Sequence, residues 1–268
     1  MIKLSYLSAI RFSGADAGSF LHNQLSADIL GLASGEATFA CYCEPKGRVL
    51  ALMLVRKAAD DYLVIMSSEL AAEVTRRLLI YRLRSKVDIE ILNDAVLGIT
   101  AGSIPELTAA TTVALPGGKQ WLSVGAADMS AVTDKSLQAA WKFAELQLGI
   151  CWLDNSSSGQ FLPQMLGFEQ LGAVNYRKGC YPGQEIVART HYLGKVKRHP
   201  RLLECMLSTG PQPMEKINIL AEGLKHEAVV ADCAAGGDGR VRLLAVTRME
   251  PGLPAEMIEY GDETVALI

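Results

Sequence analysis

Short runs of hydrophobic residues, separated by turn-forming residues, predict a mixed α and β structure for the first part of the chain. Four runs have the length and composition of strands, and they lie at 7–12, 38–43, 49–56 and 62–66. The turn Glu44-Pro45-Lys46-Gly47 would join the third run to the second. Between the first two runs, Asp16 can cap the start of a helix that runs through Leu25 and Ile29.

Helical spacing returns after the fourth run. Ser67-Ser68-Glu69 offers a helix start with an acid in the first turn. The predicted buried side of this helix consists of Leu70, Val74, Leu78 and Tyr81. Strands are expected again at 87–92 and 96–100. This order of strands and helices favours an α+β plait over a doubly wound sheet.

The middle of the chain contains one more predicted strand and one long helix. Residues 102–115 are rich in Thr, Ala, Gly and Pro and are interpreted as a variable connection, and 120–124 as a strand. The helix is expected from about Asp134 to Leu148, with Gly149 closing it. Its predicted apolar stripe consists of Leu137, Trp141, Ala144 and Leu148.

The C-terminal part carries a different pattern. Six short apolar runs are separated by Gly, Pro and Asp turns, and they lie at 202–207, 217–220, 228–231, 241–246, 257–260 and 264–268. Such runs predict six strands that form a small β-barrel. We therefore expect two regions: residues 1–195, an α+β region of two interleaved modules, and residues 196–268, the barrel.

Composition narrows the class of protein. The chain has 268 residues, 50% of them hydrophobic, which suffices for several packed modules. Lys and Arg total 26 against 29 Asp and Glu, a balance that argues against a dedicated nucleic-acid-binding protein. The start has no hydrophobic leader, and the longest apolar run, 49–55, is far shorter than the roughly 18 residues that span a bilayer. Six cysteines do not make a disulfide framework in a chain of this size, so a soluble cytoplasmic protein is expected.

One segment carries the candidate chemistry. It is Lys178-Gly179-Cys180-Tyr181-Pro182-Gly183-Gln184-Glu185, called the signature segment below. Its glycines free the backbone for close approach, and Pro182 suits the first turn of a helix that reaches about Thr190. Cys180 would then lie just before a helix N-terminus, which favours a thiolate, and Lys178 adds positive charge. Cys180 and Lys178 are therefore the candidate catalytic residues; a buried cysteine in a turn, beside a solvated lysine, is the alternative.

The remaining cysteines and histidines give no metal pattern. Cys41-Tyr42-Cys43 is the one close cysteine pair, and without a second pair it is interpreted as part of a strand rather than as a zinc site. The four histidines lack the spacing of metal ligands, so no structural metal is predicted.

The signature segment resembles that of the YgfZ family of folate-binding proteins, which are relatives of the glycine-cleavage aminomethyltransferase (T-protein). Other segments resemble this family in the same order, over roughly residues 5–200. They are 12–16, 20–28, 45–48, 81–87, 158–164 and, after the signature segment, Gly194 with Lys197 and Arg198.

The resemblance implies a T-protein-like folate-binding fold of α/β plait modules around a central hole, followed by the small barrel. It implies tetrahydrofolate or a one-carbon derivative as ligand, with Trp141 matching a tryptophan near the folate; taken alone, Trp141 fits a core position. Residues expected at the folate are Trp141, Gln147, Gln164, Tyr181, Gln184, Glu185 and Arg189. Gln147 stands where the aminomethyltransferases have a glutamate, and an amide cannot supply its carboxylate charge to the pterin.

A basic run surrounds the signature segment. Residues 177–201 contain Arg177, Lys178, Arg189, Lys195, Lys197, Arg198 and Arg201. This charge can hold a polyglutamyl tail or an RNA phosphate, and a solvated linker is the equal alternative. Because the net charge is −3 and no RNA-binding module is visible, direct RNA contact is doubtful.

Two classes of function follow. The resemblance favours a folate-binding accessory protein that uses Cys180 and supports iron–sulfur enzyme maintenance and tRNA methylthiolation, with iron–sulfur enzymes of tRNA modification as partners. The alternative is a folate-dependent aminomethyltransferase that acts on a carrier protein and needs a carboxylate near the folate. The signature cysteine is characteristic of the first class, so the sequence leans away from an enzyme without deciding the question.

Overall fold

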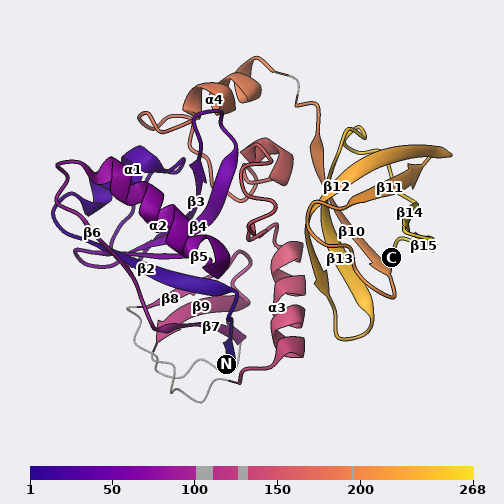
Figure 1. The fold of residues 1–268 in the computed structure, drawn as a ribbon, viewed down its shortest axis with the longest axis horizontal. Helices are drawn as coiled ribbons and strands as arrows, with labels where there is room; N and C mark the ends of the chain where they lie inside the picture. The colour runs from indigo at the N-terminus through magenta and orange to yellow at the C-terminus, as the bar shows by residue number, and fades with distance from the viewer. Residues whose placement is uncertain (101–110, 126–131, 195) are drawn as a thin grey trace.

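The computed structural model describes residues 1–100, 111–125, 132–194 and 196–268. Two α+β parts lie on the left of Figure 1 and a curled sheet lies on the right, with helix α3 (Lys135–Gln147) between them. Among the described residues, no helix has the length and apolar character needed to cross a membrane.

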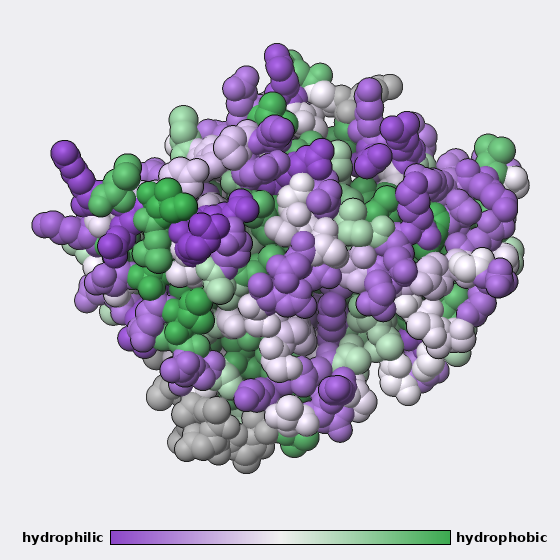
Figure 2. Space-filling model, in the orientation of Figure 1, coloured by the Kyte–Doolittle hydropathy of each residue, from purple (hydrophilic) through white to green (hydrophobic). Residues whose placement is uncertain are grey.

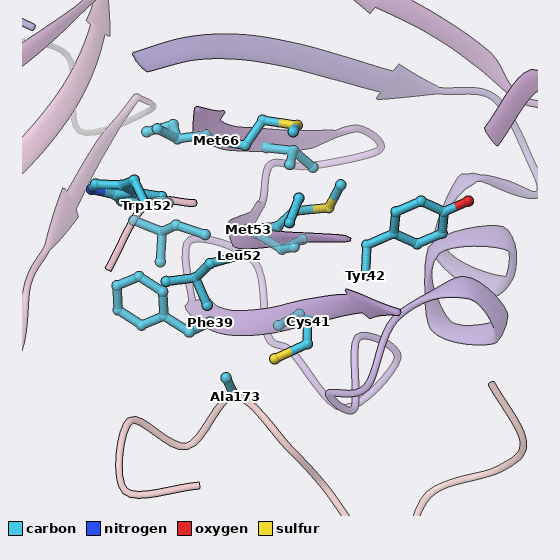
Figure 3. Close-up of a cluster of buried hydrophobic side chains, with 14 of the residues drawn as sticks. Phe39, Cys41, Tyr42, Leu52, Met53, Met66, Trp152 and Ala173 are labelled. Atoms are coloured by element: carbon cyan, nitrogen blue, oxygen red, sulfur yellow. The ribbon is translucent and has the colours of Figure 1, made fainter. Parts of the chain in front are cut away.

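The first sheet is antiparallel and follows the strand order β3-β4-β5-β2-β6. Its strands are β2 (Leu7–Ser13), β3 (Ala37–Cys43), β4 (Val49–Lys57), β5 (Tyr62–Ser67) and β6 (Asp88–Ile91). Helices α1 (Ala17–Gln24) and α2 (Ser68–Arg82) lie beside this sheet (Figure 1). Figure 3 shows the buried side chains of this sheet together with Trp152 and Ala173 from later in the chain. The Trp152 ring lies 6.1 Å from that of Phe39, so the segment before the signature belongs to the same core.

Helix α1 is shorter than predicted. It ends at Gln24, and Leu25 is already extended, because Leu25 forms a bridge with Tyr42 and the Ser26 hydroxyl accepts the backbone N–H of Cys41 at 2.7 Å. Pairing with β3 therefore replaces the helical turn that the sequence suggested for residues up to Ile29. Asp16 does precede the helix, but its carboxylate accepts the Lys86 N–H at 2.7 Å instead of capping it.

Helix α2 confirms the predicted buried positions Leu70, Val74 and Leu78, whereas Tyr81 is 50% exposed. The end of α2 packs beside β6, a short and largely exposed strand that offers little apolar cover. Figure 2 accordingly shows hydrophobic surface on the left, where α2 and β6 lie in Figure 1. The prediction for Tyr81 was wrong because the C-terminal end of α2 extends beside β6, which is too short and too exposed to bury this side chain.

The second sheet follows the order β1-β7-β9-β8. Its strands are β1 (Ile2–Lys3), β7 (Ala95–Thr100), β8 (Thr112–Ala114) and β9 (Gln120–Gly125). Most of the predicted connection at 102–115 lies outside the described residues, but Thr112–Ala114 pairs with β9 and is a strand. Since Thr112 and Val113 are β-branched, local preference agrees with this pairing.

Helix α3 begins after Asp134, whose carboxylate accepts the N–H of Ser136 at 2.7 Å, and Gly149 follows it in the left-handed region at φ 78°. Both features were predicted. The predicted apolar stripe is confirmed only in part: Trp141 is buried and Ala144 and Leu148 are half-buried, but Leu137 is 40% exposed. The buried residues of α3 are Trp141, Phe143, Glu145 and Leu146, since the helix is covered on two sides: Trp141 packs on Gly98 of β7, and Phe143 contacts the third sheet.

The third sheet contains all six predicted strands in the order β10-β13-β12-β11-β14-β15. They are β10 (His199–Met206), β11 (Lys216–Ala221), β12 (Leu224–Ala235), β13 (Arg240–Thr247), β14 (Met257–Tyr260) and β15 (Glu263–Ala266). A bridge between Cys205 and Leu267 brings the two edges of the sheet together, so it curls around its own apolar core. Lys195, at the predicted boundary, lies outside the described residues, and the division at 195/196 stays a prediction.

Candidate functional site around the signature segment

The signature segment lies between the end of α1 and the turn that joins β3 to β4, and it leads into α4 (Gln184–Tyr192). The helix begins two residues later than predicted. Gly183 has φ 82°, a left-handed conformation that ends the turn before the helix starts. Pro182 therefore belongs to the turn rather than to the first helical turn.

Two glycines fix the signature segment against the β3–β4 turn. A Cβ atom on Gly183 would lie 2.4 Å from the Glu44 carbonyl oxygen and 2.7 Å from the Gly47 Cα. A Cβ atom on Gly47, which has φ 76°, would lie 3.1 Å from the Ile186 Cβ and 3.2 Å from the Val187 Cγ2 of α4. Both positions require glycine for conformation and for space. The contact joins two motifs that are far apart in the sequence.

Lys178 is half-buried and is held by the end of α1. Its ammonium donates to the backbone carbonyls of His22 and, at 2.7 Å, Leu25. Carbonyls at a helix C-terminus have no partner within the helix, so a cation satisfies them well. Burial lowers the pKa of Lys178 to about 8, while Asp28 and Cys180 act in the opposite direction. The solvated lysine of the alternative interpretation is not what the structure has.

Cys180 is exposed, whereas Cys41, Cys43, Cys151 and Cys205 are buried and Cys233 is half-buried. This exposure excludes the alternative of a cysteine buried in the turn. Cys180 also lies four positions before the first residue of α4, and the effect of a helix dipole falls off within about one turn. The helix N-terminus is therefore a weak source of positive charge for Cys180, and Lys178 lies two positions before it in the sequence.

Gln164 connects the signature region to the preceding segment. It lies in the 3-10 helix η1 (Pro163–Leu166), and its side-chain amide donates to the Tyr176 hydroxyl at 3.1 Å and to the Val187 carbonyl at 3.0 Å. Tyr176 in turn donates to Glu169. Gln164 is buried, and its amide oxygen has no hydrogen-bond partner among the described residues. It holds α4 in place.

The other predicted site residues fall into two groups. Tyr181 is buried against the first sheet, where burial and the nearby Cys43 and Cys41 raise the pKa of its hydroxyl, and the Gln184 amide donates to the Lys178 carbonyl at 3.4 Å. Glu185 and Arg189 are exposed on α4.

Two predicted site residues, Trp141 and Gln147, lie on α3 instead. Trp141 is buried against Gly98, and Gln147 is exposed at the end of the helix. The structure therefore brings Lys178, Cys180, Tyr181, Gln184 and Gln164 into one region and leaves Trp141 and Gln147 on another element.

Sequence reasoning missed Glu145, which is fully buried on α3. The Tyr6 hydroxyl donates to its carboxylate at 2.7 Å, and burial raises the pKa of Glu145 to about 7. The indole N–H groups of Trp141 and Trp152 lie close enough to lower this pKa, although neither has the geometry of a full hydrogen bond. The available signal was spacing, since Glu145 follows Trp141 by four residues and shares its side of the helix.

Among the described residues, no group of three His, Cys, Asp or Glu side chains could hold a metal ion. The exposed members of the basic run are Arg177, Arg189, Lys197 and Arg198, while Lys195 lies outside the described residues. Arg177 precedes α4, Arg189 lies within it, and Lys197 and Arg198 follow it, so all four are available to an anionic ligand.

The chain is similar in sequence to curated bacterial proteins. No family model matches the chain. The tRNA-modifying protein YgfZ of Aliivibrio fischeri strain MJ11 is 27% identical over 266 residues, covering 91% of this chain and 83% of that protein. The protein of the same name from Vibrio atlanticus strain LGP32 is 29% identical over 223 residues, covering 76% and 69%. The chain is a relative of the YgfZ proteins.

The solved structures agree with the YgfZ relationship at the level of the fold. Glycine cleavage system aminomethyltransferase T from Bartonella henselae superposes with a TM-score of 0.72 at 15% identity, covering 99% of this chain and 83% of that one. The T-protein-like fold, with mixed α and β modules followed by a small curled barrel, is confirmed. Both YgfZ matches also confirm the resemblance to YgfZ proteins that the signature segment suggested.

Proposed function

We propose that this protein binds tetrahydrofolate or a one-carbon derivative and supports tRNA modification through the maintenance of iron–sulfur enzymes. Cys180 is its reactive thiol. The observation that carries the proposal is the exposure of Cys180 beside the half-buried cation Lys178, in a chain similar to proteins named as tRNA-modifying. The T-protein-like fold supports the folate, because the solved neighbour is an aminomethyltransferase of the glycine cleavage system.

The physical role of Lys178 follows from its surroundings. A thiol reacts as its thiolate, and a fixed positive charge nearby favours that form. Lys178 cannot move freely, since two carbonyls at the end of α1 hold its ammonium. A bound reduced folate would supply or accept the one-carbon unit. The chain's own contribution is to keep the Cys180 side chain exposed at a fixed place near this cation.

The partners and location belong to the same proposal. Iron–sulfur enzymes of tRNA modification are the proposed clients, and RNA contact is proposed to be indirect because the overall charge is −3. The location is proposed to be the cytoplasm, where free cysteines persist, and all six cysteines are unpaired. Two regions, 1–195 for the folate and 196–268 as the barrel, are part of the same proposal.

A second candidate is a folate-dependent aminomethyltransferase, favoured by the fold of the solved neighbour. It requires turnover of an aminomethylated carrier protein in the presence of tetrahydrofolate. Such turnover would reverse the order of the two candidates.

Brief alkylation with iodoacetamide at neutral pH, followed by peptide mapping, tests the thiol. We expect Cys180 to be modified first, because four of the other five cysteines are buried. Cys180→Ala should also fail to complement a strain that lacks the family member, whereas the matched control Cys233→Ala should complement it. Full complementation by a stable Cys180→Ala variant would remove the thiol from the function.

A further inference from the structure

A groove of about 570 Å³ opens beside the signature segment. One side is formed by the segment that follows α1, including Asp28 and Gly31, and the other by Asn175, Arg177 and the end of α4. This volume falls in the range of small-molecule sites, roughly 300–1,000 Å³. The groove lies close to Lys178, since Asp28 lies 3.3 Å from Nδ1 of His22 and the Lys178 ammonium donates to the His22 carbonyl.

Three aromatic rings form a rigid wall of this groove. The rings of Tyr176 and His191 are stacked, with centroids 3.9 Å apart and planes 19° apart, and Tyr192 meets His191 edge-on at 4.7 Å. Glu169 holds two of them, because it accepts the Tyr176 hydroxyl and lies 2.8 Å from Nδ1 of His191. Tyr192 is 64% exposed, so its ring is available to a ligand. A wall fixed in advance loses little freedom when a planar ring stacks on it.

Asp28 and Arg177 supply the polar chemistry. Oδ1 of Asp28 accepts the Gly31 N–H at 3.1 Å and lies 3.3 Å from His22 Nδ1. Oδ2 of Asp28 accepts no hydrogen bond from the residues that the structure describes. A carboxylate with such an oxygen suits a neighbouring pair of N–H donors on a heteroaromatic ring. Arg177 is exposed at the rim and can meet an anionic tail.

We propose that this groove binds a planar heteroaromatic ring with a 2-amino-4-oxo-pyrimidine edge, stacked on the exposed ring of Tyr192 with its N–H edge on Asp28. Two sources share this chemistry: the pterin of a folate and the guanine of a nucleotide. In its pterin form the inference rests on the proposed function, and it names where that ligand binds. Asp28 provides the carboxylate that Gln147 cannot. A pterin here would lie beside the region of Lys178 and Cys180 rather than against Trp141.

Calorimetric titration of the full chain with tetrahydrofolate and, separately, with GMP tests the groove. Asp28→Asn and Tyr192→Ala should each weaken tetrahydrofolate about 10-fold, through loss of a charge-assisted hydrogen bond and of a stacking surface. The matched controls Asp94→Asn and Tyr81→Ala change the same residue types at exposed positions outside the groove and should leave binding unchanged. Unchanged thermal midpoints show that each variant is folded.

The outcomes separate the two proposals. Tetrahydrofolate binding that is equally strong in wild type, Asp28→Asn and Tyr192→Ala would overturn the groove and leave the proposed function standing. Binding of GMP but not of tetrahydrofolate, weakened by both variants, would support the groove with guanine as its ligand and would remove the folate from the proposed function. Absence of binding by both ligands at millimolar concentration would overturn both.

Discussion

Two ionisable side chains, half-buried Lys178 and buried Glu145, differ in how many hydrogen bonds replace the water that each loses on folding. Lys178 gives up water but gains two carbonyls, whereas Glu145 is fully buried and its one directed hydrogen bond comes from Tyr6. A buried carboxylate with a single directed donor favours its protonated form, which is why the pKa of Glu145 rises to about 7. Glu145 therefore lowers stability whenever it must ionise.

We predict that Glu145→Gln stabilises the protein at pH 8 and has little effect at pH 5. Between its ordinary pKa of about 4.5 and the folded value of about 7, the folded state holds a proton that the unfolded state releases, so wild-type stability falls as pH rises through this window. The amide removes that loss and still accepts the Tyr6 hydroxyl. The free energy of unfolding in urea should rise by about 2 kcal/mol at pH 8. An equal change at both pH values would show that Glu145 does not titrate.

The sequence allowed a residue to be singled out by its type and its neighbours along the chain, but it did not reveal which distant residues surround it in the fold. Cys180 and Lys178 were predicted as candidates because a helix N-terminus and a nearby cation favour a thiolate. Glu145 and Asp28 were missed, since their roles depend on segments that are distant in the sequence. Glu145 accepts a hydrogen bond from Tyr6, near the start of the chain, and Asp28 lines a groove whose other side begins near residue 172.

At the scale of elements, the signature segment is positioned by a contact between two turns. The β3–β4 turn and the start of α4 touch through Gly47 and Gly183, both in the left-handed region. The sequence suggested both turns, and the strands around the first were predicted within about one residue. It did not reveal that the turns meet, and α4 accordingly begins at Gln184 rather than at Pro182.

We predict that Gly183→Ala destabilises the protein by about 3 kcal/mol or more, because its Cβ would meet the Glu44 carbonyl oxygen at 2.4 Å in addition to the strain of positive φ. Gly172→Ala is the matched control. Gly172 has φ 73° but nothing within 4 Å of an added Cβ, so it should lose only about 1 kcal/mol. Urea unfolding measures both variants, and similar losses would show that the contact between the turns contributes nothing beyond backbone strain.

For the whole molecule, α3 joins the second sheet to the C-terminal sheet. Lys142 pairs with the buried Asp232 of β12 at 2.6 Å, and Arg242 of β13 donates to the Phe143 carbonyl at 2.6 Å. All six strands of the C-terminal sheet were predictable because turns punctuate them at short intervals. The packing of α3 between the two sheets was not predictable, since the sequence analysis assumed a single apolar stripe and the helix is covered on two sides.

We predict that Lys142→Met destabilises the protein by about 3 kcal/mol, since it leaves the Asp232 carboxylate buried without its cation. Lys142→Met combined with Asp232→Asn should recover most of this loss, because the second change removes the unpaired charge. The exposed pair Lys216–Glu227 offers a control, and Lys216→Met should change stability by less than about 1 kcal/mol. Thermal unfolding of the wild type and these three variants measures this, and a double variant no more stable than Lys142→Met alone would show that the unpaired Asp232 charge is not the cause of the loss.

Calorimetric titration of the wild-type protein with mono- and polyglutamylated tetrahydrofolate tests whether this protein binds a folate. We predict saturable binding, and tighter binding of the polyglutamyl form because Arg177, Arg189, Lys197 and Arg198 are exposed near the signature segment in the sequence. The preference for polyglutamate should shrink as salt is raised, since exposed charges are screened. No detectable heat of binding for either form at millimolar ligand would contradict the assignment of a folate to this protein.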